Sequence, residues 1–231
     1  MFRSGALLIV PPRGFMDQTI FHLINEQWTH PALDLFMAAI SNVNIWMPFI
    51  VVVLLIPLIF GGFKGRALLF CAGVALLVNS SLTNELKRFV DRRRPKQAER
   101  VRMVELAKAR PEFLTLFKPV KIRYSDASDR NKSGPSFPSG HVTNNVTVAI
   151  VLALFLRRWG WLYSVVAAAI GYSRIYLGAH WPSDVLATVF LAAGETFLVL
   201  ALLELLWGSL GKHWWADFYQ RHPRLISRDP A

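Results

Sequence analysis

The sequence predicts an all-α protein: an integral membrane helical bundle of about six helices, forming a single domain over residues 1–231. Of the 231 residues, 53% are hydrophobic and 18% are charged, and the mean hydropathy is +0.34. The apolar residues gather in five long runs, which is typical of membrane proteins. Tryptophans, whose rings favour the headgroup region, stand at the ends of these runs: Trp46, Trp159, Trp161, Trp181 and Trp207.

The five apolar runs are expected to be membrane-spanning helices. The last, Val185–Leu206, would be about 33 Å long as a helix, which is enough to cross the apolar core of a bilayer. A short run alone would suit a buried helix of a soluble protein, but five in one small chain favour a membrane protein. Glu195 and Glu204 interrupt the last run and are expected to serve helix packing. The other runs are Ile45–Gly62, Ala67–Leu82, Val142–Leu156 and Trp159–Tyr172.

A sixth segment, Thr19–Val43, mixes polar residues such as His22 and Asp34 with apolar ones. This mixture predicts either an amphipathic helix at the membrane surface, the favoured interpretation, or a spanning helix with its polar face inside the bundle. The stretch Ala6–Val10 is too short for a cleavable signal peptide, so the later segments are expected to direct insertion.

The segment 88–137 is a long polar loop outside the membrane, with 14 Lys or Arg and 6 Asp or Glu residues. Its part Glu99–Leu116 has the composition of a short surface helix. The net charge of the chain is +11, but no nucleic-acid motif accompanies it, so the expected partner is the lipid bilayer. The single cysteine, Cys71, excludes an internal disulfide.

The short connections between the runs predict an orientation. If the helices alternate in direction, three basic groups share one face, which the positive-inside rule makes cytoplasmic. The long loop would then lie on the opposite face, the periplasmic face in a bacterial inner membrane, although its own positive charge argues against this. The three basic groups are Lys64 and Arg66; Arg157 and Arg158; and Lys212, Arg221, Arg224 and Arg228.

Three polar clusters border the runs on that opposite face: Lys87–Pro95 (KRFVDRRRP), Pro138–His141 (PSGH) and Ser173–Asp184 (SRIYLGAHWPSD). Each alone is typical of a membrane-edge anchor, a turn or a helix end. Together they predict a phosphate site, because a small-residue turn before a helix presents free N–H groups and basic side chains neutralise phosphoryl oxygens. The expected phosphate-binding residues are Lys87, Arg94, Ser139, Gly140 and Arg174.

The two histidines of these clusters suit phosphoryl transfer. Asp184 follows His180 by four residues and is expected to fix the imidazole tautomer, which leaves the other ring nitrogen free as the nucleophile. His141 has no comparable carboxylate nearby, so we expect it to act as general acid for the leaving group and then as general base for water. No group of residues has metal-ligand spacing, so neither a metal nor another cofactor is predicted.

In this order, the patterns Lys-x6-Arg-Pro, Pro-Ser-Gly-His and Ser-Arg-x5-His-x3-Asp resemble the tripartite signature of the phosphatidic acid phosphatase type 2 superfamily. The resemblance covers about Asn79–Leu206 and has no departure at the signature positions. It implies a metal-independent membrane lipid phosphatase of about six helices with a phosphohistidine intermediate. It also implies that His180 is the nucleophile, that His141 is the acid, and that the five residues above bind phosphate.

The sequence leaves several functions open. A lipid phosphate or diphosphate phosphatase is the main prediction, and its expected partner is a membrane lipid substrate. The candidate substrates are an undecaprenyl diphosphate-like lipid, phosphatidylglycerol phosphate, phosphatidate and lipid A, with the basic loop slightly favouring a multiply charged headgroup. A lipid-to-lipid phosphotransferase is the first alternative. A vanadium-haloperoxidase-like enzyme fits the apolar runs poorly, and a non-enzymatic binding protein fits the catalytic residue types poorly.

Overall fold

Four long apolar stretches dominate the computed structural model, which describes residues 14–132 and 134–226. Each has the length and composition needed to cross a membrane: Val43–Phe60, Gly62–Phe89, Gly140–Tyr176 and Pro182–Trp214. Two features discussed from the sequence, Ala6–Val10 and Arg228, lie outside the described residues.

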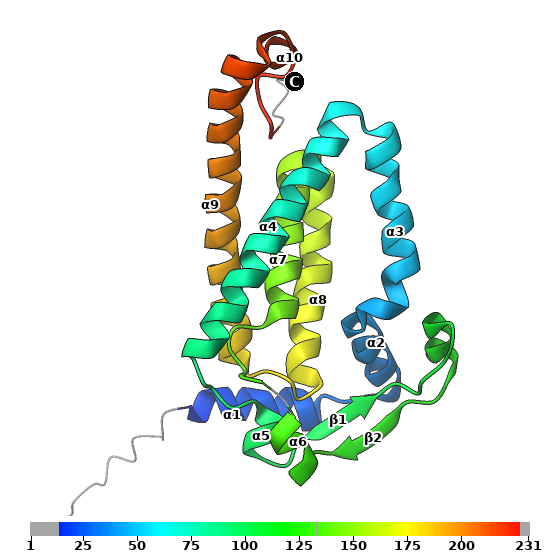
Figure 1. The fold of residues 1–231 in the computed structure, drawn as a ribbon. Coiled ribbons are helices and arrows are strands. Elements are labelled where there is room, and N and C mark those ends of the chain that lie inside the picture. Colours follow the sequence, from blue (N-terminus) through cyan, green and yellow to red (C-terminus); the bar gives the residue numbers. More distant parts are fainter. Residues whose placement is uncertain (1–13, 133, 227–231) are drawn as a thin grey trace, which may run out of the picture.

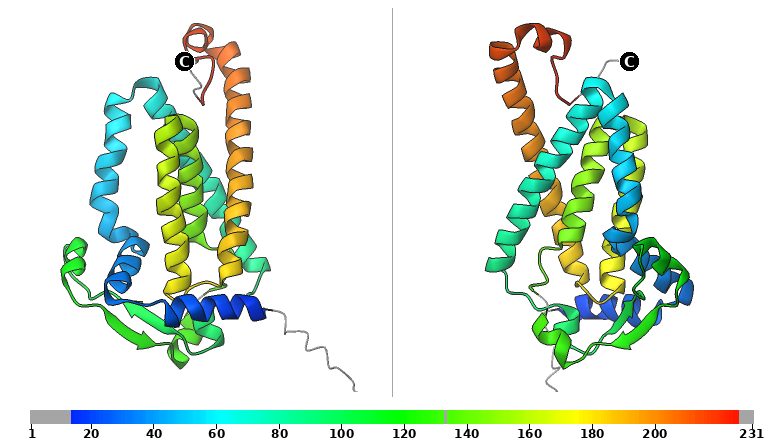
Figure 2. Two further views of the ribbon diagram at one scale, coloured as in Figure 1. Left: turned by 180° about the vertical axis from the view of Figure 1, so that it is seen from behind. Right: turned by 45° about the vertical axis from the view of Figure 1, so that its right-hand side comes forward.

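The third stretch contains two helices, so the five expected runs correspond to five helices. They are α3 (Val43–Phe60), α4 (Gly62–Phe89), α7 (Gly140–Leu156), α8 (Tyr163–Tyr176) and α9 (Pro182–Trp214). The chain reverses between α7 and α8 through the 3-10 helix η3 (Arg157–Leu162), and these helices pack together with α4 and α9 (Figures 1 and 2). Helix α3 stands apart and packs on α4, and its apolar side chains are almost all exposed, as expected of a surface that faces lipid.

One end of the bundle, at the bottom of Figure 1, gathers the polar segments, and we call it the polar end. There α4 and α8 end and α7 and α9 begin. The opposite, far end carries the turn between α3 and α4, the 3-10 helix η3 and the short helix α10 (Ala216–Arg221). The alternating directions expected from the sequence are therefore confirmed, and the described basic connections share the far end.

The N-terminal segment forms two short helices instead of one long one. Helix α1 (Phe15–His22) continues as the π-helix η1 (Leu23–Gln27) and lies across the polar end, and α2 (Pro31–Ser41) follows it (Figure 1). Pro31 at the start of α2 and the ring of His30, which accepts a hydrogen bond from the N–H of Ala32, set the boundary. Eleven residues make a helix of about 16 Å, which is too short to cross a bilayer.

The polar loop corrects two predictions. Strands β1 (Arg102–Glu105) and β2 (Lys121–Tyr124) form an antiparallel pair, so the fold is not purely helical. The expected surface helix over Glu99–Leu116 was also wrong, because β1 occupies its first half and the 3-10 helix η2 (Glu112–Phe117) its end. In β1, buried and half-buried residues alternate, which is the period of a strand. Two short helices complete the loop: α5 (Pro95–Ala98) and α6 (Ala127–Lys132).

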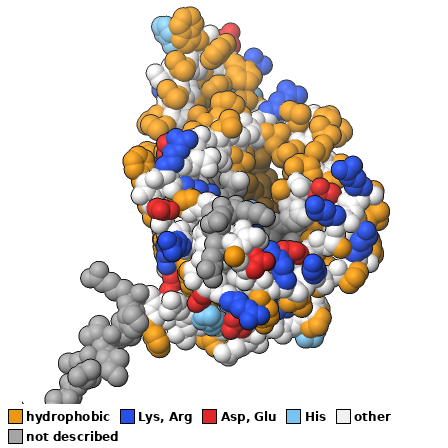
Figure 3. Space-filling view, turned by 60° about the horizontal axis from the view of Figure 1, so that its bottom comes forward, with side chains coloured by type: hydrophobic (Ala, Val, Ile, Leu, Met, Phe, Trp, Pro, Cys, Tyr) orange, Lys and Arg blue, Asp and Glu red, His pale blue; other side chains and the backbone are white. Residues whose placement is uncertain are grey.

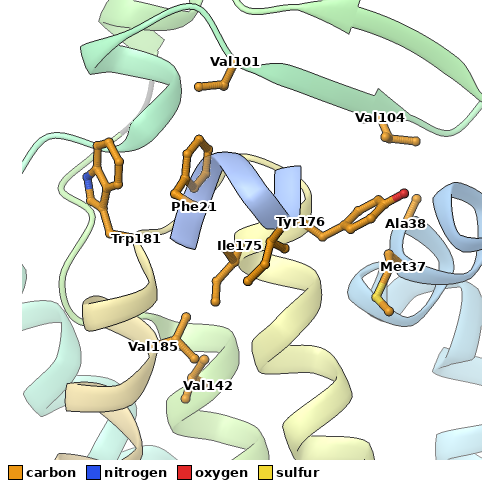
Figure 4. Close-up of a cluster of buried hydrophobic side chains, with 11 residues drawn as sticks. Phe21, Met37, Ala38, Val101, Val104, Val142, Ile175, Tyr176, Trp181 and Val185 are labelled. Carbon is orange, nitrogen blue, oxygen red and sulfur yellow. The ribbon is translucent and has the colours of Figure 1, made fainter. Parts of the chain in front are cut away.

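A hydrophobic cluster fixes the N-terminal helices and the loop to the polar end (Figure 4). The rings of Phe21 and Trp181 lie 5.1 Å apart between α1 and the start of α9. Beside them, Asp34 accepts hydrogen bonds of 2.6 Å from both Arg102 and Tyr176. These contacts tie α2, β1 and the end of α8 together, and breaking such a buried pair by removing one partner costs about 3–5 kcal/mol.

Buried polar contacts also hold the bundle together. The amide nitrogen of Asn79 in α4 donates to Thr147 in α7 at 2.8 Å and to Thr196 in α9 at 2.9 Å. Such interhelical hydrogen bonds stabilise helix packing in a membrane. Near the far end, the carboxylate of Glu204 accepts hydrogen bonds from the backbone N–H groups of Leu225 and Ile226, so these contacts hold the segment after α10 against α9 and do not join two helices.

Candidate active site

The three polar clusters of the sequence meet at the polar end. Lys87 lies in the last turn of α4, and Gly140 begins α7. A side-chain carbon placed on Gly140 would lie 3.8 Å from the Nζ atom of Lys87, so the start of α7 faces this ammonium group. The two ends, more than fifty residues apart in sequence, form one site.

The start of α7 combines one hydrogen-bond donor that is already used with one that is not. The backbone N–H of Ser139 donates to the hydroxyl of Thr188 at 3.0 Å. The hydroxyl of Ser139 is buried and has no partner among the described residues. The first N–H groups of a helix have no partner within the helix and favour an anion. This corner therefore suits a phosphoryl group, as the sequence predicted for Ser139 and Gly140.

Two arginines complete the positive side of the site. Arg94 is held in place by donating to the carbonyl oxygens of Gly134 at 2.8 Å and Pro135 at 3.3 Å. Burial lowers the pKa of Arg94 from its ordinary value. Arg174 donates to the hydroxyl of Ser41 at the end of α2, and its Nε atom is buried with no partner in the described part of the chain. A ligand phosphate is the natural partner for such a donor.

A tight turn places His180 next to Arg174. The backbone N–H of His180 donates to the carbonyl of Arg174 at 3.1 Å, and Gly178 adopts a φ of 70° within this turn. A side chain on Gly178 would approach Val101 to 3.0 Å, so glycine satisfies both the left-handed backbone and the close packing. The side chain of His180 is 2% exposed.

The structure connects His180 and Asp184 indirectly, through a serine that the sequence did not indicate. Ser136 lies between them: its hydroxyl donates to Asp184 at 2.5 Å and lies 3.5 Å from Nδ1 of His180. The imidazole also lies near the backbone of Ser136. Asp184 additionally accepts from the backbone N–H of Trp181 at 3.1 Å, because it caps the first turn of α9.

Arg92 and Asp17 are two residues of the site that the sequence reasoning missed. The guanidinium of Arg92 donates to Asp184 and to Asp17, each at 2.6 Å. Asp17, in α1, also accepts from the backbone N–H of Ser183 at 2.8 Å. These bonds connect α1 to the start of α9 and hold Asp184 in place. Arg92 stood within the predicted basic cluster, but nothing in the local sequence signalled Asp17.

His141 lies in the first turn of α7. Its side chain is exposed, and its imidazole lies near the backbone of Ser41 at the end of α2. It is within electrostatic range of Arg174, Arg94 and Lys87. His141 therefore lies at the surface of the site, close to its cations.

The environment of His180 keeps its imidazole neutral. Burial lowers the pKa of His180 well below its ordinary value of 6.5, and the charges of Arg94 and Arg174 lower it further. A neutral imidazole has the lone pair that a nucleophile needs. The site therefore contains a buried neutral histidine, three cations near it, and a second, exposed histidine.

A comparison with protein families gives the same result. The model of the PAP2 superfamily matches residues 67–207, which is more than half of the chain and contains all three clusters. The chain belongs to the PAP2 superfamily. The family predicted from the three motifs is confirmed, and with its long apolar helices this PAP2 protein is an integral membrane protein.

Curated relatives match parts of this PAP2 protein. An undecaprenyl-diphosphatase from Sulfolobus acidocaldarius is 41% identical over 64 residues, which is 27% of this chain and 31% of the relative. A lipid A 4'-phosphatase from Bacteroides thetaiotaomicron is 30% identical over 163 residues, 68% of this chain and 64% of the relative. The first match therefore spans about a third of the relative's length.

A solved structure shares the fold. The crystal structure of Aquifex aeolicus LpxE has a TM-score of 0.56 and 25% sequence identity, and the match covers 80% of this chain and 95% of that one. The similarity thus extends beyond the matched family region and includes much of the helical arrangement.

Proposed function

We propose that this PAP2 protein is a phosphatase that hydrolyses the phosphate or diphosphate headgroup of a membrane lipid through a phosphohistidine on His180. The observation that carries the proposal is the placement of a buried, neutral His180 beside the cations of Lys87, Arg94 and Arg174. Phosphoryl transfer depends mainly on positioning and on neutralisation of the equatorial oxygens, which these groups supply.

In the first step, Nε2 of His180 attacks phosphorus, a P–N bond forms, and the bond from phosphorus to the leaving oxygen breaks. His141 gives its proton to that oxygen. Nδ1 faces Ser136, so Nε2 is the nitrogen assigned to attack. Asp184, acting through Ser136, stabilises the positive charge that develops on the ring, while Ser139 and Gly140 donate hydrogen bonds to the phosphoryl oxygens.

In the second step, His141 takes a proton from water as the oxygen of that water attacks phosphorus. The P–N bond breaks, inorganic phosphate leaves, and His180 is neutral again. A lipid acceptor in place of water would make the protein a phosphotransferase, and the same residues would serve both reactions.

The substrate is proposed from the candidates named above: an undecaprenyl diphosphate-like lipid, phosphatidylglycerol phosphate, phosphatidate or lipid A. Two relatives are named as an undecaprenyl-diphosphatase and a lipid A 4'-phosphatase, which supports a membrane lipid with a phosphorylated headgroup. We assign the polar end to the periplasmic face of a bacterial inner membrane, because the described basic connections share the far end.

The test is phosphate release by the purified protein in detergent micelles from each of the four lipids, with His180→Ala as the control. We expect release from at least one lipid and none above background for the variant. A lipid alcohol added as acceptor distinguishes the two reactions, because a phosphotransferase would transfer the labelled phosphoryl group to it. No release or transfer from any of the four lipids would reject the proposal.

A further inference from the structure

A cavity of about 840 Å³ opens beside the candidate active site. The end of α2, strand β1, the segment that follows β1, and η2 surround it, and Arg174 and Leu177 of α8 contribute to its wall. This volume is in the range of sites that hold a small molecule or a headgroup, and it exceeds what one phosphate needs. The proposed reaction gives no role to most of this space.

Arg174 and Ser41 connect the cavity to the site of phosphoryl transfer. Both residues line the cavity, and they are hydrogen-bonded to each other. The imidazole of His141 lies near the backbone of Ser41. A lipid whose phosphate lies between His180 and His141 would therefore present the rest of its headgroup to this cavity.

The lining of the cavity is positively charged. Lys108, Arg110 and Lys118 contribute cations in addition to Arg174, and the ammonium group of Lys118 donates to the carbonyl of Lys108 at 3.0 Å, which draws η2 toward the segment after β1. Basic side chains are also spread over this end of the molecule (Figure 3). The cavity therefore favours an anion.

Two acidic residues of the lining reduce this charge only in part. The acidic residues are Glu105 and Glu112. Glu105 forms an ion pair of 2.6 Å with Arg123, which does not line the cavity, so the charge of Glu105 is offset. Thr115 adds a further polar group to the lining. This residue is only 5% exposed, and its hydroxyl has no partner among the described residues. An unused buried hydroxyl in the wall of a cationic cavity is suited to a phosphate oxygen.

We propose that this cavity binds a second phosphate of the substrate headgroup, and that the protein therefore prefers lipids with two phosphates over lipids with one. The inference rests on the proposed phosphatase function. The second phosphate is either the lipid-linked group of a diphosphate, whose terminal phosphate reacts with His180, or a phosphate elsewhere on a headgroup sugar. The two sources share the chemistry that Lys108 and Arg110 recognise.

The test compares wild-type protein with the double variant Lys108→Ala/Arg110→Ala on three lipids: phosphatidate, diacylglycerol diphosphate, and lipid A with two phosphates. For at least one two-phosphate lipid we expect kcat/KM to fall by about tenfold or more, mainly through KM, since a hydrogen bond to a charged group is lost. For phosphatidate, we expect a change within about twofold. The lipid that shows the loss identifies the source of the second phosphate.

The matched control is Lys121→Ala/Arg100→Ala, which removes two exposed basic side chains of the same polar loop that do not line the cavity. An equal loss in this control would attribute the effect to general surface charge and overturn the inference. An equal loss on phosphatidate, or no loss on either two-phosphate lipid, would do the same. Lys108→Met/Arg110→Met, with longer side chains, replaces the double variant if that protein does not fold.

A binding measurement separates this inference from the phosphatase proposal. Calorimetry with His180→Ala protein compares fructose 1,6-bisphosphate with fructose 6-phosphate, and pyrophosphate with phosphate. We expect at least one two-phosphate probe to bind about tenfold more tightly than its one-phosphate partner, and Lys108→Ala/Arg110→Ala to abolish this preference. If wild-type protein is inactive on all lipids, the proposed phosphatase function is rejected, but the cavity assignment is not. If no two-phosphate probe binds more tightly than its one-phosphate partner, the cavity assignment is rejected.

Discussion

The hydroxyl of Ser136 donates a hydrogen bond of 2.5 Å to the carboxylate of Asp184, and the same hydroxyl lies 3.5 Å from Nδ1 of His180. The acidic residue that would stabilise a charged imidazole thus acts through a serine. Asp184 and Ser136 are fully buried and His180 nearly so, so the connection is protected from water. In the proposed reaction this contact turns Nδ1 toward Ser136 and leaves Nε2 for attack on phosphorus.

Ser136→Ala breaks this connection and leaves Asp184 bonded to Arg92 and to the N–H of Trp181. We expect kcat to fall about 10- to 100-fold with little change in KM, because a hydrogen bond to a charged group contributes about 1.5–3 kcal/mol. Steady-state phosphate release measures this. Ser128→Ala, at an exposed serine of α6, is the control. An unchanged kcat in Ser136→Ala would show that His180 does not depend on the serine.

Arg92→Ala removes the residue that connects Asp17 and Asp184. Asp184 is buried, and a buried charge without its partner is destabilising, but Arg92 is itself 38% exposed and water screens part of the effect. We therefore expect a loss of about 1–3 kcal/mol, seen as a lower melting temperature in detergent. The neighbouring Arg93→Ala, whose side chain is exposed, is the control. Equal melting temperatures for the two variants would contradict the role of Arg92.

The neutral state of His180 predicts a specific pH dependence. Burial, followed by Arg94 and Arg174, holds its pKa below 6.5, so the imidazole stays neutral as the pH falls through 6.5, where an unfolded histidine gains a proton. This group thus contributes stability above pH 6.5 that is lost as the pH falls toward its folded pKa. NMR titration of labelled histidines should show an upward shift of the His180 pKa in Arg94→Gln. A pKa at or above 6.5 in the wild type would contradict the account.

The residues that the sequence predicted are those fixed by helix ends. Lys87 and Gly140 border apolar runs, and His180 lies in the turn between α8 and α9, so the alternation of helix direction was sufficient to bring them together. Ser136 could not be assigned, because its contact with Asp184 depends on the path of a loop. Asp17 lies 75 residues before Arg92, and the position of α1 across the polar end depends on packing between Phe21 and Trp181.

The strand pair β1–β2 was missed for a similar reason. Its partners Arg102 and Tyr124 are 22 residues apart, and charged side chains interrupt the apolar alternation that would indicate a strand. Burial of Arg102 against Asp34 and Tyr176, from distant parts of the chain, stabilises β1. Local sequence therefore predicted the transmembrane part of the fold better than the polar end.

The assignment of the polar end to the periplasmic face is tested by cysteine labelling in a bacterial host. In a Cys71→Ala background, Lys121→Cys lies in β2 at the polar end, and Arg158→Cys lies in η3 at the far end. We expect a membrane-impermeant thiol reagent to label Lys121→Cys on cells freed of their outer membrane, and Arg158→Cys only after lysis. The reverse pattern would place the candidate active site in the cytoplasm.

The central claim is that His180 carries the phosphoryl group, and rapid quenching with a ³²P-labelled lipid phosphate tests it most directly. Wild-type protein quenched within the first turnover should hold label that is stable in alkali and lost in acid, as expected for a phosphohistidine. His180→Ala should hold none, while His141→Ala should still be labelled when the leaving group is a good one, since such a group needs little protonation. Labelled His180→Ala protein, or turnover without any labelled wild-type protein, would contradict the account.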